Sequence, residues 1–204
     1  VFMSIWHNIS SERISAEDFI SVIEIPRDCK VKYEMDKETG FLRMDRVLHT
    51  ATHYPANYGF IPHTLADDND PLDVLVLGSV PVYPMTLIRC YPIGAIKMTD
   101  NNENDEKIIA IPFGDPNYNT YTSINDLPKH KFDEMVHFFT VYKELENKQT
   151  AVQEIVDVDE AVKIINSSIA NYNKVLRTFN ILTEDMRIFA KSFHHSALIL
   201  SVLY

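Results

Sequence analysis

The sequence predicts a mainly β, α+β single domain, and three observations support this prediction. Short β-branched and aromatic runs recur at intervals of roughly ten residues in the first half of the chain. Helical periodicity takes over in the second half. The chain has 204 residues and is 46% hydrophobic, which is enough for one well-cored domain, and no internal repeat or low-complexity linker divides it.

The expected strands are separated by turn chemistry, and DKETG is expected to close a hairpin through Gly40. Strands that follow each other so closely favour a small closed antiparallel β-barrel, OB-like in form, over alternating βαβ units. We expect the β part to end near Asp115. The strands are expected at residues 19–25, 31–35, 41–47, 73–80, 86–98 and 107–113.

The helices are expected to pack on the outside of this barrel. In residues 130–146, apolar side chains such as Phe132, Met135 and Phe139 recur at helical spacing. A second helix is expected over residues 157–176, with Asp157 or Asp159 as its cap, and a third over residues 183–204.

Charge and cysteine usage exclude several classes of partner. The formal net charge is −10 and the pI is near 5.2, which disfavours nucleic acid and anionic membranes as partners. Cys29 and Cys90 have no metal or redox spacing, so we expect packing residues in a reducing cytoplasm. No signal peptide is expected, and the closing ALILSVLY is too short to span a bilayer, so we expect a docked or oligomer-forming tail.

The segment DDNDPLD, residues 67–73, crowds four carboxylates together just before an apolar run. Asp68 and Asp70 would share one side of an extended segment, and the bend at proline would bring Asp73 to the same point. Oxygen ligands of this kind suit Mg²⁺, Mn²⁺ or Ca²⁺ rather than zinc. The alternative is a solvated acidic loop. An EF-hand is disfavoured, because Leu72 stands where that loop needs glycine.

A second acidic segment, TDNNENDEK, carries Asp100 and Asp105 between two expected strands. On its own it would be an ordinary exposed turn. Two acidic loops at strand ends are placed to converge on one polynuclear metal site, although the sequence leaves open whether they face each other.

Cations and tyrosines accompany these carboxylates along the chain. Each one alone is a plausible surface or barrel-wall residue. The chain has five glycines and no P-loop motif, so side chains and metals would have to hold any phosphate. The polar side chains in question are Lys32 and Glu34 on one face of a strand, Arg46, Lys107 and Lys143, with hydroxyls from Tyr54, Tyr58 and Tyr142.

These motifs together resemble those of the family I soluble inorganic pyrophosphatases. The D-x-D-P-x-D-V signature reads DNDPLDV at residues 68–74. The resemblance runs from about residue 18 to about residue 170, and leaves a C-terminal helical extension at about 173–204. The supporting motifs, in the family's order, are EIP (24–26), KYEMDKETG (32–40), DR (45–46), YPANYGFIPHT (54–64) and HFFTVYKELE (137–146).

The resemblance implies hydrolysis of pyrophosphate to two phosphates with several Mg²⁺ ions per active site, or Mn²⁺ as a substitute. Asp70 would be the general base beside a metal-activated water that attacks in line. The activating metals would be held by Asp68, Asp73 and Asp105, with Asp100 at a further site and Glu34 at a substrate-borne metal. Phosphate would be bound by Lys32, Arg46, Tyr58, Lys107, Tyr142 and Lys143, with Glu24 and Tyr54 in supporting roles.

Two features depart from the family pattern. Many members read D-E-x-G-x-D-x-K in the second acidic loop, where this chain has Asn101 and Glu103 instead of the second acid and the glycine. We expect activity to survive, because the spacing of Asp100, Asp105 and Lys107 is kept. The C-terminal extension is expected to affect assembly, for which a homo-oligomer is predicted, with a hexamer favoured over a dimer.

The sequence disfavours two other functions. A Nudix-type pyrophosphohydrolase would need an R-E-x-x-E-E helix, which the sequence lacks. A barrel-based binding module with a structural Ca²⁺ loop is disfavoured for nucleic acid by the net charge and by the absence of a basic, aromatic-rich stripe.

Overall fold

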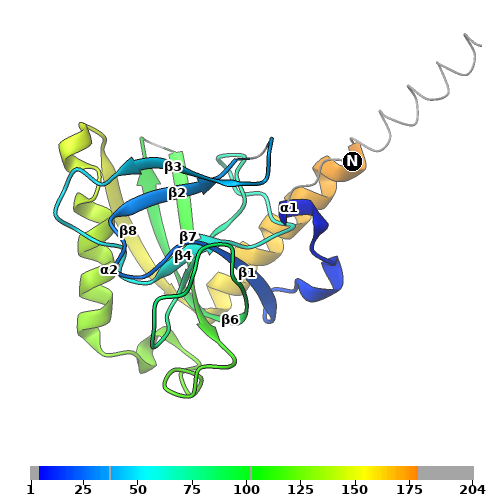
Figure 1. Ribbon diagram of the computed structural model, residues 1–204. Helices are drawn as coiled ribbons and strands as arrows, with labels where there is room; N and C mark the ends of the chain where they lie inside the picture. Colours follow the sequence, from blue (N-terminus) through cyan, green and yellow to red (C-terminus); the bar gives the residue numbers. More distant parts are fainter. Residues whose placement is uncertain (1–4, 37, 102, 179–204) are drawn as a thin grey trace, which may run out of the picture.

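The computed structural model describes residues 5–36, 38–101 and 103–178 (Figure 1). Within these residues the fold is mainly β, with helices beside the strands, as the sequence predicts. A six-stranded sheet has the order β1-β4-β5-β7-β6-β8, and β2 and β3 form a separate hairpin. The strands are β1 (Phe19–Ile25), β2 (Val31–Met35), β3 (Leu42–Val47), β4 (Asn57–Phe60), β5 (Asp73–Val76), β6 (Leu87–Asp100), β7 (Glu103–Pro112) and β8 (Thr150–Asp157).

The pairing of β5 with β7 is parallel, so the expectation of a purely antiparallel sheet is wrong. In the sheet, β7 lies between β5 and β6, antiparallel to β6 and parallel to β5. The remaining pairs are antiparallel, and β1 is bonded to β6 as well as to β4.

The expected end of the β part near Asp115 is also wrong, because β8 pairs with β6 along most of its length. The sequence of β8, TAVQEIVD, has no long apolar run, and every one of its residues is exposed or half-buried. The short β4 was not expected either. Strands β6 and β7 extend further than predicted, so Asp100 and Asp105 lie within strands and not in the loop between them.

The expected hairpin through Gly40 is confirmed. Gly40 has φ 73°, a left-handed conformation that glycine adopts without steric strain, and its N–H donates to the Asp36 carbonyl at 2.8 Å. The hairpin register places Lys32 opposite Arg46 and Glu34 opposite Arg43.

Helix α2 (Lys129–Val141) is shorter than expected. The chain leaves it at Tyr142 and forms a separate 3-10 turn, η3 (Glu144–Glu146), that ends at Asn147 with φ 56°. Lys143 therefore follows the helix and does not lie inside it. Residues 158–178 are helical, and the Asp157 carboxylate accepts the N–H of Val158 at 2.8 Å. The helix expected over residues 183–204 lies outside the described residues.

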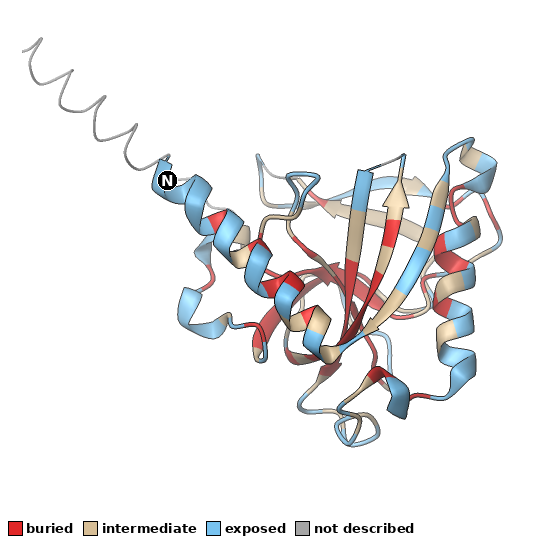
Figure 2. Ribbon diagram, turned by 180° about the vertical axis from the view of Figure 1, so that it is seen from behind, coloured by how far each residue is buried: buried red, intermediate tan, exposed pale blue. Residues whose placement is uncertain are grey.

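Alternate residues of the central strands face two apolar clusters, as the period of two in a strand requires. Leu75 packs in the cluster that includes Phe139 of α2, whereas Val74 packs in the cluster that includes Ile165. Figure 2 shows the buried side of the 158–178 helix against the strands and its exposed side toward solvent. Three short helices were not expected: α1 (Ile5–Asn8), η1 (Ser11–Arg13) and η2 (Ile124–Asp126).

The two cysteines are unpaired, Cys90 within the second cluster and Cys29 against the first, which agrees with their expected role in packing. In the part of the chain that the structure describes, no helix combines the length and apolar character needed to cross a membrane.

Gly59 is a position at which the sheet tolerates no side chain. A Cβ there would lie 1.8 Å from the carbonyl oxygen of Val22 on the neighbouring strand. We therefore expect Gly59→Ala to lower the free energy of unfolding by about 4 kcal/mol or more, because backbone atoms would have to move apart. Gly114→Ala is the matched control, since its Cβ would meet nothing within 4 Å. Equal denaturation midpoints for both variants would contradict the β1–β4 packing described here.

Candidate active site

One cavity of about 580 Å³ collects nearly all the side chains that the sequence singled out. It opens between the β2–β3 hairpin, the acidic loop before β5, and the ends of β6, β7 and α2. Arg46 alone among the predicted site residues is not part of its lining. Those that line it are Glu24, Lys32, Glu34, Tyr54, Tyr58, Asp68, Asp70, Asp73, Asp100, Asp105, Lys107, Tyr142 and Lys143.

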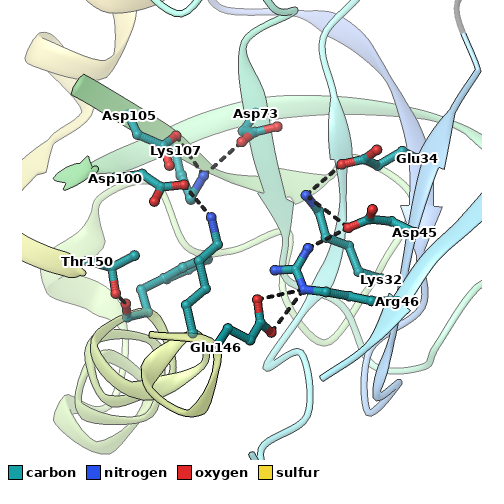
Figure 3. Close-up of polar contacts among 12 residues, drawn as sticks. Lys32, Glu34, Asp45, Arg46, Asp73, Asp100, Asp105, Lys107, Glu146 and Thr150 are labelled. Carbon is teal, nitrogen blue, oxygen red and sulfur yellow. Dashed lines mark hydrogen bonds and ion pairs between the residues drawn. The ribbon is translucent and has the colours of Figure 1, made fainter. Parts of the chain in front are cut away.

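Lys107 is a buried lysine of this cavity lining and is 2% exposed. Its Nζ is 2.7 Å from Oδ2 of Asp73 and 2.8 Å from Oδ1 of Asp105 (Figure 3). It also donates to the Tyr58 hydroxyl at 3.1 Å. Asp73 is the register partner of Lys107 on β5, and Asp105 precedes it by two residues, so both share its face of the sheet. Burial alone would lower the pKa of Lys107, but Asp73, Tyr58 and Asp105 raise it well above its ordinary value.

A second ion pair joins Lys143, just past α2, to Asp100 at the end of β6. Burial lowers the pKa of Lys143, and the bond to Asp100 only partly opposes this effect. Among the described residues, Oδ1 of Asp100 is buried without a hydrogen-bond partner. A buried carboxylate oxygen without a partner is strongly disfavoured, so a cation or a hydrogen-bond donor bound at this atom would stabilise it.

The hairpin contributes a third group. Nζ of Lys32 is 2.6 Å from Oε1 of Glu34, and Arg43 reaches Oε2 of the same carboxylate at 2.9 Å. Burial raises the pKa of Glu34, but the two cations lower it below its ordinary value overall. Arg43 also lines the cavity and was missed in the sequence. Its position opposite Glu34 across the Gly40 turn was the signal that could have identified it.

Arg46 lies beside the cavity and is held by two carboxylates. Its Nε is 2.9 Å from Oε1 and 2.8 Å from Oε2 of Glu146, and its Nη1 forms an ion pair with Asp45 (Figure 3). The Glu146 side chain is only 6% exposed. Among the described residues, Nη2 of Arg46 is buried and has no hydrogen-bond partner. No sequence signal connects Glu146 to Arg46, because 100 residues separate them.

The acidic loop is a turn and not the extended segment expected. Asn69 has φ 65°, and the N–H of Asp70 donates to Oδ1 of Asp68 at 2.9 Å. Burial raises the pKa of Asp68, and repulsion from Asp73, Asp70 and Asp105 raises it further. The negative charges of these carboxylates therefore repel one another, and a bound cation would reduce the repulsion.

The carboxylate oxygens of the cavity are the type of ligand that hard divalent cations prefer, although several of these carboxylates are paired with lysines. Within the described ranges, no three acidic, histidine or cysteine side chains form a group that could hold a metal ion. The ammonium of Lys107 occupies the space between Asp73 and Asp105. The all-oxygen donors, the mutual repulsion around Asp68 and the unpartnered oxygen of Asp100 are the features that suit Mg²⁺ or Mn²⁺.

Glu24 and the tyrosines form the inner wall. Oε1 of Glu24 accepts the Met35 N–H at 2.7 Å, and burial raises the pKa of Glu24 to about 8. Tyr54, Tyr58 and Tyr142 are all buried, and burial raises the pKa of each phenol. Tyr58 donates to the carboxylate of Asp73, so this wall also supports the acidic cluster.

Comparison with known proteins agrees with this geometry. The family model described as inorganic pyrophosphatase matches residues 21–173. An inorganic pyrophosphatase of Caulobacter vibrioides is 50% identical over 161 residues, which are 77% of this chain and 91% of the relative. Soluble inorganic pyrophosphatase 2 of Chlamydomonas reinhardtii is 45% identical over 170 residues, 83% of this chain and 88% of the relative.

Solved structures give the same result. The inorganic pyrophosphatase of Helicobacter pylori superposes with a TM-score of 0.76 at 41% identity, and covers 78% of this chain and 95% of its own. That of Coxiella burnetii gives 0.76 at 43% identity, with 80% and 99% covered. This chain thus has a mainly β fold in which acidic and basic side chains line one cavity. The chain belongs to the family I soluble inorganic pyrophosphatases, which confirms the resemblance found in its motifs.

The raised pKa of Glu24 predicts a pH-dependent stability. Between about pH 4.5 and pH 8 the folded protein keeps a proton on Glu24 that the unfolded chain releases, so the free energy of unfolding falls as pH rises through this window. Glu24→Gln stays neutral and can still accept the Met35 N–H. We expect this variant to match the wild type near pH 5 and to exceed it at pH 8 by on the order of a few kcal/mol.

Denaturant unfolding at both pH values, in EDTA, measures this difference. Glu17→Gln is the control, because Glu17 is exposed and lies outside the cavity lining. Parallel pH profiles for the wild type and Glu24→Gln would contradict the proposed burial of a neutral Glu24.

Proposed function

We propose that this chain hydrolyses inorganic pyrophosphate to two phosphates. The observation that supports this most directly is the meeting, in one cavity, of the DNDPLD carboxylates, the Asp100 and Asp105 pair, and the ammonium groups of Lys32, Lys107 and Lys143. A dense mixture of both charges suits a small, highly charged anion that arrives with metal ions. The family relationship supports the same substrate.

The residues proposed to hold Mg²⁺, or Mn²⁺ in its place, are Asp68, Asp73 and Asp105, with Asp100 at a further site and Glu34 toward a metal on the substrate. Bound divalent ions would lower the pKa of a water molecule and neutralise charge on the phosphates. The carboxylates now paired with lysines would then face cations, and the lysines would be free to bind phosphate oxygens.

Asp70 is the proposed general base. It lines the cavity from the exposed tip of the acidic loop, beside Asp68, and does not share an ion pair with Lys107 as Asp73 and Asp105 do. A carboxylate in that position can orient the attacking water and accept its proton. In-line attack at one phosphorus then expels the other phosphate.

The proposed phosphate-binding lysines lie among the proposed metal ligands, since each forms an ion pair with one or two of them. Lys32, Lys107 and Lys143 are ammonium donors from three separate elements, so they can meet oxygens at both ends of pyrophosphate. Arg46 joins them through its unpartnered Nη2, with Glu146 and Asp45 holding the other edges of the guanidinium. Tyr58 and Tyr142 complete this set, with Glu24 and Tyr54 supporting the wall.

We further infer that the sheet closes into the small OB-like barrel, which the pairing of β1 with both β4 and β6 supports. The single domain over 1–204, the cytoplasmic location and the homo-oligomer, hexamer before dimer, stay predictions. Exposed apolar side chains such as Phe41 and Tyr83 provide surface for self-association.

The direct test is phosphate release from pyrophosphate by the purified protein, with Mg²⁺, with EDTA, and with ATP as a competing substrate. We expect rapid release that requires the divalent ion and is specific for pyrophosphate. Absence of release with Mg²⁺ and with Mn²⁺ would refute the proposed function.

Asp70→Asn is expected to lower kcat by about 10²–10⁴-fold, because the amide cannot accept the proton. The fold should remain intact, since the change removes one charge from a repulsive loop. Asp67→Asn is the matched control, an exposed carboxylate in the same loop that does not line the cavity, and it should keep the wild-type rate. Equal kcat values in the two variants would show that Asp70 is not the base.

A further inference from the structure

The segment of residues 5–14 packs against the base of the acidic loop, far along the sequence from it. This segment precedes residues 21–173, which the family model matches. Figure 1 shows α1 beside the 158–178 helix, on the side of the molecule away from α2. The segment, the helix and the loop thus meet at one point.

The two ends of the acidic loop come together at a narrow neck formed by Ile61, Thr64 and Leu72. Thr64 is fully buried there. The N–H of Ile61 donates to the carbonyl of Leu72 at 2.9 Å and closes the neck. The Thr64 hydroxyl spans the same gap, since it donates to the Ile61 carbonyl at 2.5 Å and accepts the Leu72 N–H at 2.9 Å. Further out, the N–H of Ala66 donates to the carbonyl of Asp70 at 2.8 Å. The position of Thr64 therefore sets where the acidic tip begins.

Trp6 binds this neck from outside. Its indole Nε1 donates to the carbonyl of Thr64 at 3.0 Å, and its own carbonyl accepts the N–H of His63 at 3.2 Å. The His63 ring is 2.6 Å from the carbonyl of Ile9, and His63 itself is left-handed at φ 57°. Two successive residues of the neck are thus bound by the N-terminal segment.

The 158–178 helix fixes the segment in turn. Nδ1 of His7 is 2.7 Å from the Tyr172 hydroxyl, and the His7 ring stacks on Trp6 with centroids 4.7 Å apart. The helix also contacts the loop directly, because the Leu65 N–H donates to the carbonyl of Ser168 at 2.9 Å. A rigid helix therefore supports both partners of the Trp6 to Thr64 bond.

We infer that Trp6 is a positioning residue for the loop that carries Asp68 and Asp70, and that residues 5–14 clamp this loop in its metal-binding conformation. The inference rests on the proposed function, which assigns these carboxylates to metal and water. Like charges at the loop tip push apart, so the loop needs restraint from outside the site. The clamp supplies that restraint without contact to substrate.

The first test is Mg²⁺ binding by titration calorimetry without substrate. Trp6→Phe keeps an aromatic ring and removes the N–H donor. We expect its dissociation constant for Mg²⁺ to rise about threefold to tenfold, the equivalent of one lost hydrogen bond. In turnover, saturating Mg²⁺ should restore kcat, whereas a loss of general packing would not be rescued by metal.

Tyr91→Phe is the matched control. It also removes one partly buried side-chain donor, the hydroxyl that bonds the carbonyl of Tyr121 at 2.7 Å, and Tyr91 does not line the active-site cavity. It should leave the Mg²⁺ affinity unchanged. An equal loss of affinity in both variants would show a general effect of stability and overturn the inference.

Amide hydrogen exchange in EDTA tests the clamp without metal or activity. In Trp6→Phe the amides of Leu65, Ala66 and Asp70 should exchange faster than in the wild type and in Tyr91→Phe. Unchanged exchange at these amides would overturn the inference, whatever the calorimetry shows. Faster exchange in a protein whose wild type binds no Mg²⁺ would instead support the clamp and refute the proposed metal site.

Discussion

The site depends on one constraint, the almost complete burial of the Lys107 ammonium. An ammonium withdrawn from water is strongly disfavoured unless carboxylates meet it, and Asp73 and Asp105 do so from two strands. The contact with Asp73 requires this register of β5 with β7, since a shift of one residue would turn Lys107 to the opposite face, whereas Asp105 lies two residues from Lys107 on β7 itself. The topology of the sheet and the chemistry of the cavity are therefore fixed by the same pair of strands.

The charge pattern of the cavity follows from the same requirement. Each lysine that lines it has a carboxylate partner, so the acidic and basic groups hold one another in the absence of ligands. A free anion would be repelled by the carboxylates, whereas divalent cations held by them would neutralise their charge. Cations at the carboxylates together with an anion at the ammonium groups would satisfy both sets, and the proposed pyrophosphate with its metal ions has this composition. The net charge of −10 is compatible with such an anion site, because bound cations would supply the positive charge that the chain lacks.

Much of this site could be predicted from the sequence where local chemistry was decisive. The DNDPLD carboxylates, the Gly40 turn and the Lys32 and Glu34 pair are all set by residues close together in the chain. The parallel β5–β7 pair could not be predicted, because it depends on the spatial order of strands and not on their composition. Strand β8 carried no clear alternation, and Glu146 finds Arg46 across 100 residues. The left-handed turn at Asn69 was missed because its conformation is determined by the neck beneath it.

That neck shows how an acidic loop can be held in a conformation its own charges oppose. Asp68 and Asp70 repel each other and Asp73, so the loop would open if only its tip determined its shape. The Thr64 hydroxyl, the Trp6 indole and the Ser168 carbonyl bind the base of the loop instead. These bonds are made by main-chain groups and by the side chains of Thr64 and Trp6, so the restraint of the loop does not depend on the carboxylates of its tip.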